Sequence, residues 1–335
     1  MRILVTGAAG FIGSHLVDLL VERHTVVGLD AFMTGSNPLN LSNSSNFQFV
    51  KGDIRNVELI GSLLSGKTKF GKIEAVINCA AETHVDRSID KPISFVDSNV
   101  LGTANLLHQS YLHDIEKMVQ VSSDEVYGSW NSNITISGLG IVNTNKAGFD
   151  ESDRLNPSSP YAASKAAGDN LCLAWFKTYE LPVCITRCTN NFGPRQFPEK
   201  LIPLVINRAL HNKEIPVYGN GLNVRDWIFV KNHCLAIETV LKSGQPGEIY
   251  NIAGKMEISN LDLIHQILDL LNKPYNLIKF VKDRPAHDAR YFINSDKITK
   301  LGYIPNRTGW IENLSQTVRW YERALKSSYF EDQII

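Results

Sequence analysis

The sequence predicts an α/β fold, a doubly wound parallel sheet followed by a smaller C-terminal α/β lobe. Apolar, β-rich runs recur through the first 190 residues, and helical stretches separate them. These runs lack polar alternation, as strands do when helices cover both faces of a parallel sheet. After about residue 190 the pattern becomes irregular. We therefore expect a first domain over residues 1–190 and a second lobe over residues 191–335, with a soft boundary between them.

The expected elements follow one another in regular order up to residue 190. We expect strands at residues 2–7, 25–30, 47–54, 74–81, 117–123 and 182–188, and helices near 14–24, 57–64, 99–112 and 161–179. Beyond them we expect a helix after Pro198, short strands at 215–219, 248–254 and 278–281, and a last helix at 310–325. The chain of the second lobe is expected to return to the sheet at least once. Residues 129–150 are expected to form a long polar loop between two candidate catalytic segments.

Composition narrows the possible functions. Lys plus Arg and Asp plus Glu both total 34, so the net charge of zero argues against nucleic acid or an anionic membrane as a partner. No apolar run approaches the roughly 20 residues of a membrane span, and the first residues lack a signal-peptide pattern, so we expect a cytoplasmic protein. The five cysteines include no Cys-x-x-Cys pair; we interpret them as buried thiols and expect no metal site.

A glycine motif follows the first expected strand. Gly7, Gly10 and Gly13 have the spacing G-x-x-G-x-x-G, which lets backbone approach a pyrophosphate at a helix N-terminus. A glycine triplet alone could equally be a tight turn. Asp30, at the end of the second strand, strengthens the dinucleotide interpretation because an acid there accepts hydrogen bonds from ribose hydroxyls and repels a 2′-phosphate. The pair of signals favours NAD over NADP.

Polar residues follow the carboxyl ends of further strands, which gather along one crevice in a doubly wound sheet. Asp53 and Ile54 end the third strand, and residues 79–83 end the fourth. The fifth strand is followed by Asp124 and Glu125, which we expect at the nicotinamide end of the crevice. A helix cap and first turn would also place acids there, and that role is compatible with catalysis.

Tyr161 and Lys165 are four residues apart and should share one face of a helix. A tyrosine hydroxyl, with a pKa of about 10, is a poor base at neutral pH. A nearby ammonium and a cationic nicotinamide both favour the phenolate, which could then take a proton from a substrate hydroxyl while hydride leaves to the cofactor. An isolated Tyr-x-x-x-Lys is common by chance, so the prediction depends on the glycine motif upstream.

Several segments together resemble the extended short-chain dehydrogenase/reductase family, which has a Rossmann fold. Within it the chain is most similar to the nucleotide-sugar 4,6-dehydratases, in particular those that act on dTDP-glucose. The resemblance extends over nearly the whole chain, and it rests on the segments "AAETHVDRSI", "SSDEVYG", "SPYAASKAAGD", "RCTNNFGPRQFPEKLIPL", "YGNGLNVRDWIFV", "GEIYNIAG" and "DRPAHDARY".

The resemblance implies a mechanism and a homodimer, formed through a helix bundle. By this resemblance, Tyr161 and NAD would oxidise carbon 4, Glu125 would remove the carbon 5 proton, and Asp124 would protonate the departing carbon 6 hydroxyl before hydride returns to carbon 6. Ser123 stands where the family usually has Thr, and its hydroxyl can still bind the oxygen at carbon 4. Two close carboxyls tend to split their pKa values, which suits one base and one acid.

The resemblance also implies two sets of binding residues. For NAD they are Gly7, Gly10, Phe11, Ile12, Gly13, Asp30, Ala31, Phe32, Asp53, Ile54, Cys79, Ala80, Ala81, Ser98, Tyr161, Lys165 and Asn191. For the nucleotide sugar they are Thr83, Ser123, Asn190, Lys200, Leu201, Pro216, Val217, Tyr218, Arg225, Asn260, Asp283, Arg284 and His287. Ala31, Arg195 and Ala286 depart from the family pattern. His84 and His233 are expected to be packing or loop residues.

Two other functions compete with a dehydratase. A 4-epimerase or decarboxylase of the same family, acting on a UDP-sugar, would use Tyr161 and Lys165 without needing an acid pair. A catalytically idle NAD-binding scaffold would need none of the five candidate catalytic residues, Ser123, Asp124, Glu125, Tyr161 and Lys165.

Overall fold

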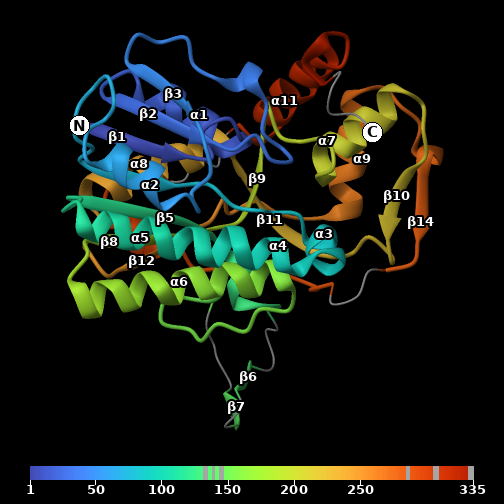
Figure 1. Ribbon diagram of the computed structural model, residues 1–335. Helices are drawn as coiled ribbons and strands as arrows, with labels where there is room; N and C mark the ends of the chain where they lie inside the picture. The colour runs from blue at the N-terminus through green and yellow to red at the C-terminus, as the bar shows by residue number, and fades with distance from the viewer. Residues whose placement is uncertain (131–134, 138–139, 143–146, 284–286, 305–308, 331–335) are drawn as a thin grey trace.

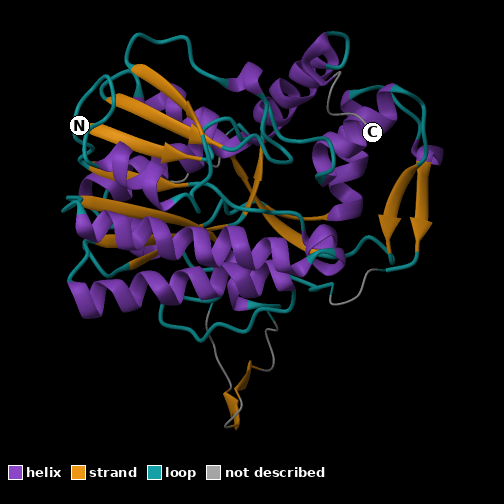
Figure 2. Cartoon of the chain, viewed as in Figure 1, coloured by secondary structure: helices purple, strands orange, loops and turns teal. Residues whose placement is uncertain are grey.

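A seven-stranded parallel sheet forms the centre of the computed structural model (Figures 1 and 2). The structure describes residues 1–335 except 131–134, 138–139, 143–146, 284–286, 305–308 and 331–335. The strand order is β12-β8-β5-β4-β1-β2-β3. The strands are β1 (Arg2–Thr6), β2 (Thr25–Asp30), β3 (Phe47–Lys51), β4 (Ala75–Asn78), β5 (Lys117–Ser123), β8 (Val183–Cys188) and β12 (Ile249–Ile252). The expected doubly wound parallel sheet is confirmed.

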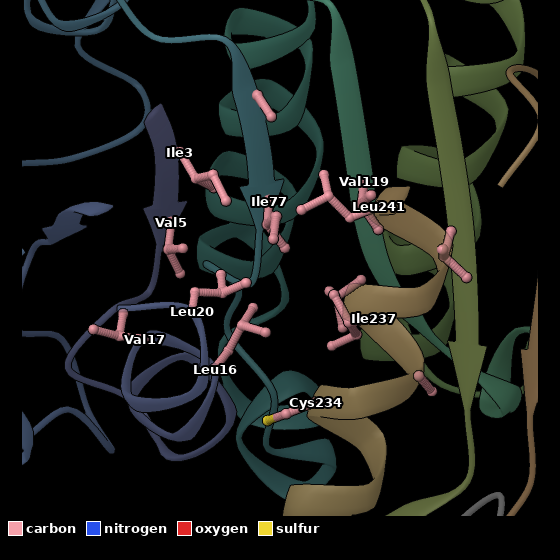
Figure 3. Close-up of a cluster of buried hydrophobic side chains, with 14 of the residues drawn as sticks. Ile3, Val5, Leu16, Val17, Leu20, Ile77, Val119, Cys234, Ile237 and Leu241 are labelled. Atoms are coloured by element: carbon pink, nitrogen blue, oxygen red, sulfur yellow. The ribbon is translucent and has the colours of Figure 1, made fainter. Parts of the chain in front are cut away.

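Helices cover both faces of the sheet, as the unbroken apolar strands predict. On one face, α1 (Phe11–Leu20) packs against α8 (Val230–Ser243). Their apolar side chains meet those of the strands in one cluster, which includes Ile3, Leu16 and Ile237, each fully buried (Figure 3). On the other face lie α2 (Val57–Leu64), α5 (Thr103–Leu112) and α6 (Pro160–Tyr179).

The last strand of the sheet comes from the second half of the chain. β12 pairs with β8 in parallel, with Ile249 opposite Ile185. Together with α8, it contributes residues after 190 to the sheet domain. The exact division at residue 190 stays a prediction.

The remaining elements of the second lobe form a separate core. A three-stranded sheet has the order β13-β11-β9, and β10 pairs with β14 in parallel beside it. The apolar faces of α7, α9 and α11 close this core, which buries Ile206, Ile264 and Leu314. The strands are β9 (Asn190–Phe192), β10 (Ile215–Tyr218), β11 (Val224–Phe229), β13 (Glu257–Ser259) and β14 (Ile278–Val281). The helices of this lobe are α7 (Leu201–Leu210), α9 (Asn260–Leu270) and α11 (Trp310–Ala324), whereas α10 (Asp296–Thr299) packs against β12 and buries Ile298 in the core of the sheet domain.

The segment 129–150 differs from the expected loop. Two short strands, β6 (Thr135–Ser137) and β7 (Gly140–Val142), pair there in antiparallel register and project beyond α6 (Figure 1). Residues 131–134, 138–139 and 143–146 of this segment lie outside the described residues. At its two ends, Trp130 and Phe149 are buried with their rings edge to face at 4.8 Å. These contacts close the base of the segment onto the domain.

The region of the expected helix at 99–112 is divided between a π-helical turn and the helix α5, and further helical structure precedes it from residue 85. Two short helices, α3 (Val85–Asp90) and α4 (Pro92–Val96), precede a π-helical turn, η2 (Asp97–Gly102), which leads into α5. Such turns often occur at functional sites. Here the turn holds Asn99, whose amide donates to Ser164 Oγ at 2.8 Å and to Glu82 O at 2.9 Å.

The described part of the chain contains no helix that is long and apolar enough to cross a membrane. The five cysteines are free thiols, of which four are buried and Cys79 is partly buried.

Candidate active site

One cleft, with an internal volume of about 340 Å³, lies at the carboxyl ends of β1, β4 and β5. Ser123, Asp124, Glu125, Tyr161 and Lys165 all line it. Of the residues expected to bind the cofactor, every one except Phe32 lines it as well. The sheet therefore gathers the candidate catalytic residues and the candidate dinucleotide residues in one place, although they extend from Gly7 to Asn191 in the chain.

The glycine turn at one end of the cleft matches the shape that a pyrophosphate needs. Gly7 has φ +69°, and a Cβ on Gly13 would lie 2.0 Å from the Gly7 carbonyl oxygen, so strand and helix can pack this closely only with glycine. α1 begins directly after Gly10, and no side chain caps its N-terminus. The first amides of the helix are thus left for an anionic ligand.

Asp30 lies next to this turn and is 5% exposed. Its Oδ2 accepts a hydrogen bond from Ala9 N at 2.9 Å, and its Oδ1 accepts one from Phe32 N at 2.7 Å. The two backbone donors fix the carboxylate at the end of β2, where it still has lone pairs for ligand hydroxyls. Phe32 has φ +53° and lies outside the cleft lining, so its expected cofactor contact stays a prediction.

The acid pair lies in a 3-10 turn, η3 (Asp124–Tyr127), directly after β5. Ser123 is the N-cap, and its Oγ accepts a hydrogen bond from Glu125 N at 3.2 Å. The serine therefore satisfies the turn, and the two carboxylates are not needed as caps. Both acids line the cleft.

Asp124 is suited to hold a proton. It is 3% exposed, and its Oδ2 has no hydrogen-bond partner among the described residues. Burial raises the pKa of Asp124 well above its usual range, and the carboxylates of Glu125 and Asp226 raise it further, while Arg225 and a bond from Ser123 Oγ at 3.3 Å act in the opposite direction. The buried carboxyl therefore stays neutral to a higher pH than a free one.

Tyr161 and Lys165 lie in the first turns of α6. Ser159 caps this helix by accepting from Ala162 N at 3.1 Å, and Pro160 occupies the first helical position. Burial lowers the pKa of Lys165, whose Nζ donates to Val121 O at 2.7 Å. The ammonium is thus fixed against β5, beneath the acid pair.

The sequence predicts surroundings that favour the Tyr161 phenolate, whereas the side chains around Tyr161 in the structure favour the neutral phenol. Burial raises the pKa of Tyr161 well above 10, and the Glu125 carboxylate raises it further, whereas a hydrogen bond with Ser123 lowers it. The Asp124 carboxylate also raises the pKa of Tyr161. In the chain without ligands the phenol is therefore neutral, and a cationic ligand group would be needed to shift it toward phenolate.

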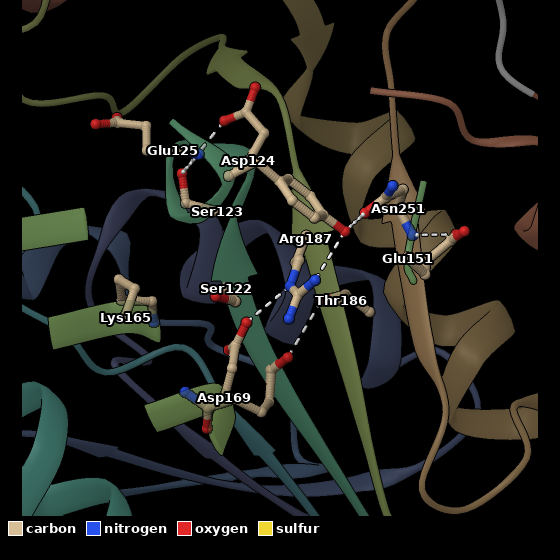
Figure 4. A network of polar contacts seen from close by, with 12 residues as sticks. Ser122, Ser123, Asp124, Glu125, Glu151, Lys165, Asp169, Thr186, Arg187 and Asn251 are labelled. Atoms are coloured by element: carbon tan, nitrogen blue, oxygen red, sulfur yellow. Dashed lines mark hydrogen bonds and ion pairs between the residues drawn. The ribbon is translucent and has the colours of Figure 1, made fainter. Parts of the chain in front are cut away.

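A buried polar network supports the acid turn from behind (Figure 4). Arg187, on β8, forms an ion pair of 2.8 Å with Asp169 on α6, and both side chains are almost fully buried. Arg187 also donates to Tyr127 OH at 2.8 Å, and Tyr127 donates to Asn251 Oδ1 at 2.9 Å. The network thus joins the last residue of η3 to the helix that carries Tyr161 and Lys165.

The thiols in the cleft are not reactive nucleophiles. Burial raises the pKa of Cys79 to about 12 and that of Cys188 to about 12. Both remain protonated at neutral pH, and they contribute apolar surface to the cleft wall.

The residues expected to bind the nucleotide sugar divide into two groups. Thr83, Asn190, Lys200 and Leu201 line the cleft, as Ser123 does, and Lys200 Nζ donates to Thr83 O at 2.7 Å. Outside the cleft lining are Pro216, Val217, Tyr218, Arg225, Asn260, Asp283 and His287. Arg284 and Ala286 lie outside the described residues.

Part of the second group forms a cluster at the ends of β10 and β14, where Tyr218 is the last residue of β10 and Asp283 and His287 follow β14. His287 Nδ1 lies 2.6 Å from Asp283 Oδ1, and the rings of Tyr218 and His287 are 6.2 Å apart, edge to face. Arg225 lies on β11, stacked 4.3 Å over the Tyr291 ring, and its guanidinium donates to Asp288 O at 2.8 Å.

Sequence reasoning missed several residues of the cleft. They are Met33, Thr34, Gly35, Ser36, Glu82, Gln196, Phe197, Glu199 and Trp227, among others. Glu199 directly precedes Lys200, and it pairs with Arg87 at 2.8 Å. Its position in the segment "FPEKLIP" was an available signal, because an acid beside a candidate ligand lysine shares its surroundings.

Two buried histidines hold the chain segment that carries Asn190 and Asn191. His15 Nε2 lies 3.0 Å from Pro194 O, and His233 Nδ1 lies 2.9 Å from Asn191 Oδ1. Burial lowers the pKa of His15 to about 4 and that of His233 to about 3. Both are packing residues in their neutral form, as the sequence analysis expected for His233.

We expect the free energy of unfolding to fall as the pH decreases below about 6.5. In the unfolded chain both histidines take up a proton near pH 6.5, whereas in the folded chain they do so only near pH 4 and 3, so acid favours unfolding. Each histidine should lower the free energy of unfolding by about 1.4 kcal/mol per pH unit between its two pKa values. Urea unfolding at pH 7, 6 and 5 measures this slope. His233→Asn keeps a donor for Asn191 and should remove about half of it; an unchanged slope would contradict the assignment.

Comparison with known proteins identifies clear relatives. A family model described as GDP-mannose 4,6 dehydratase matches residues 4–311. A dTDP-glucose 4,6-dehydratase from Streptomyces niveus is 43% identical over 333 residues, covering 96% of this chain and 93% of the relative. A solved structure of the dTDP-glucose 4,6-dehydratase from Streptomyces venezuelae, with NAD and dTDP bound, has a TM-score of 0.88 and 40% identity, covering 96% of this chain and 97% of its own.

The same fold also occurs in an epimerase. The UDP-glucose 4-epimerase from Thermotoga maritima, solved with UDP-glucose, has a TM-score of 0.86 but only 25% identity, covering 97% of this chain and all of its own. Fold alone therefore does not separate the two reactions.

Proposed function

The chain belongs to the GDP-mannose 4,6-dehydratase family, within the extended short-chain dehydrogenases/reductases, and on this premise we propose how it acts on its substrate. It is an NAD-dependent nucleotide-sugar 4,6-dehydratase, a hydro-lyase, that converts dTDP-glucose into dTDP-4-keto-6-deoxyglucose. The observation that carries this function is the acid pair: Asp124 and Glu125 share one cleft with Tyr161 and Lys165. Oxidation at carbon 4 needs only the second pair, whereas loss of water needs a further base and acid.

The cleft fits NAD at its glycine end. Gly7, Gly10 and Gly13 leave room for the pyrophosphate beside the uncapped start of α1, and the fixed carboxylate of Asp30 suits the adenosine ribose. When bound, NAD accepts a hydride from carbon 4 and returns it to carbon 6, so the reaction involves no net oxidation. The other cofactor contacts expected from the sequence, which extend to Ser98 and Asn191, are proposed on the same basis.

Each of the chain's own catalytic groups has a defined task. Tyr161 takes the proton of the carbon 4 hydroxyl, and Lys165 holds positive charge beneath it. The resulting ketone acidifies the carbon 5 hydrogen, which Glu125 removes. Asp124 acts as the acid, because burial favours its protonated form. It gives that proton to the carbon 6 hydroxyl as the C–O bond breaks.

Substrate binding is proposed to span both lobes. Ser123 and Thr83 contact the sugar from the cleft, and Lys200 contacts the phosphates. Tyr218, Asp283 and His287, which lie together just beyond the ends of β10 and β14, contact the nucleotide from the second lobe. The remaining residues proposed for this role are Asn190, Leu201, Pro216, Val217, Arg225, Asn260 and Arg284.

We expect a turnover screen to identify the substrate and the reaction together. Purified protein with NAD is incubated with dTDP-glucose, UDP-glucose, GDP-mannose and UDP-N-acetylglucosamine, and the products are analysed by mass. A dehydratase product has lost one water, an epimerase product has the mass of its substrate, and a decarboxylase product has lost carbon dioxide. Loss of water from dTDP-glucose supports the proposal; turnover of UDP-glucose without a mass change would replace it with the epimerase.

Asp30 should enforce a preference for NAD over NADP of well over tenfold in dissociation constant. The buried carboxylate accepts ribose hydroxyls but repels a 2′-phosphate. Isothermal titration with both dinucleotides measures the preference. Asp30→Ser should reduce it severalfold. Asp53→Ser, which changes another acid of the same cleft, can alter the affinity for both dinucleotides but should leave their ratio unchanged. Equal affinities of the native protein for NAD and NADP would remove Asp30 from this role.

We further propose that the chain acts as a homodimer in the cytoplasm. The elements α4, η2, α5 and α6 lie side by side (Figure 1). Each carries an exposed large apolar side chain, namely Ile93, Leu101, Leu112 and Tyr179. A second copy would bury them as a helix bundle. The free cysteines support a reducing compartment.

A further inference from the structure

One wall of the cleft is formed by residues that were not expected to bind the cofactor. Residues 33–36, in the connection between β2 and the short helix η1 (Pro38–Asn40), line the cleft beside Asp30. Two asparagines, Asn37 and Asn40, end this connection, and they are 5% and 2% exposed. We call residues 31–40 the cofactor loop.

Both asparagines bind the glycine turn through one residue, Ala9, which lies between Gly7 and Gly10. The Ala9 carbonyl accepts from Asn37 N at 3.0 Å and from Asn40 Nδ2 at 2.8 Å. The Ala9 amide donates to Asp30 Oδ2 at 2.9 Å. The cofactor loop, the turn and the ribose-binding acid are therefore joined through the two polar groups of one peptide residue.

A segment almost 300 residues away holds the same two asparagines. Tyr329 lies in η5 (Ser328–Phe330), which we call the strap. Its carbonyl accepts from Asn37 Nδ2 at 2.8 Å, and its hydroxyl donates to Asn40 Oδ1. Asn37 Oδ1 also accepts from Leu39 N at 2.9 Å as the cap of η1. The amide oxygen and nitrogen of each asparagine thus have partners, and neither side chain can rotate without losing buried hydrogen bonds.

The strap is itself fixed by aromatic packing against α11. Phe330 is 2% exposed, and its ring stacks on Tyr321 with centroids 6.1 Å apart. The Tyr329 ring lies edge to face with Trp320 at 4.9 Å. The Tyr321 hydroxyl donates to the carbonyl of Gln196, another residue of the cleft. α11 therefore provides a rigid base for the strap.

We propose that Tyr329 is a positioning residue that keeps NAD in the cleft between turnovers, an inference that rests on the proposed function. The reaction returns its hydride to the sugar, so the cofactor need not leave, and its loss between oxidation and reduction would strand a keto sugar. Retention requires the turn at Ala9 and the cofactor loop to stay in their binding conformation. The strap fixes both through Asn37 and Asn40, and so lowers the ordering cost of binding.

The test removes one strap bond at a time. Tyr329→Phe loses the hydroxyl that binds Asn40 and keeps the ring and the carbonyl. Asn37→Ser keeps a cap for η1 but cannot reach the Tyr329 carbonyl. Tyr275→Phe is the matched control, because that hydroxyl binds Asp269 at 2.7 Å on an exposed surface away from the cleft. Equilibrium dialysis with NAD gives the dissociation constant, and thermal unfolding without NAD reports stability.

Each strap variant should raise the dissociation constant of NAD about threefold to tenfold, the effect of one buried hydrogen bond. The variant that combines Tyr329→Phe with Asn37→Ser should raise the dissociation constant of NAD further, whereas Tyr275→Phe should leave it unchanged. At saturating NAD, the turnover of the strap variants should stay within twofold of that of the native protein. A lower melting temperature with an unchanged dissociation constant would make the strap merely structural and overturn the proposal. Failure of the native protein to bind NAD would instead refute the proposed function, so the two failures are distinguishable.

Discussion

Glu125→Gln should slow dehydration of dTDP-glucose by about a hundred- to ten-thousandfold, the usual cost of removing a general base. The amide keeps the size of the side chain but cannot accept the carbon 5 proton. Because oxidation by Tyr161 precedes elimination, quenched reactions should contain undehydrated sugar. In deuterium oxide the native enzyme should place deuterium at carbon 5 of the product, and the variant should not.

Two further variants make this result specific. Asp124→Asn should permit exchange at carbon 5 but slow departure of the carbon 6 hydroxyl, which then lacks its proton donor. Glu151→Gln is the control: this partly buried acid accepts from Asn251 N at 2.9 Å, a bond that an amide oxygen can keep, and its activity should stay near native. Native dehydration by Glu125→Gln would reduce the acid pair to a structural turn and favour an epimerase.

Tyr161→Phe should abolish measurable oxidation at carbon 4, again a loss of at least about a hundredfold, because it removes the hydroxyl that takes the substrate proton. Lys165→Ala should have a comparable effect, since it removes a buried amine of the same cleft, one helical turn after Tyr161. Conversion of dTDP-glucose, measured by mass, reports both. Tyr303→Phe is the control, because its buried hydroxyl has no hydrogen-bond partner among the described residues.

A second measurement separates the roles of Tyr161 and Glu125. The 4-keto-6-deoxy product has an acidic carbon 5 hydrogen and needs no oxidation. Supplied in deuterium oxide, it should exchange that hydrogen on Tyr161→Phe at a near-native rate and fail to exchange it on Glu125→Gln. Exchange by neither variant would show that Tyr161 acts in both steps, and exchange by both would remove Glu125 from proton transfer.

Much of the fold follows from patterns that are local in the sequence. Apolar runs such as residues 117–123 predicted buried parallel strands, and Ser159 with Pro160 marks the start of α6, so that Tyr161 and Lys165 fall on one helical turn. The sequence around Thr135–Ser137 does not reveal its strand, because strands of three residues have too little periodicity to be recognised.

The sequence by itself determined which chemical groups the cleft contains: the glycine turn, Asp30, the acid pair and the Tyr-Lys pair all stand at strand or helix ends, and such ends gather at one edge of a parallel sheet. Only the tertiary structure decided their properties. Burial, together with Glu125 and Asp226, holds the proton on Asp124, and Arg187 joins the acid turn to α6. The strap reaches Asn37 from 292 residues away. Electric fields and buried hydrogen bonds depend on distance in space, which separation along the chain does not reveal.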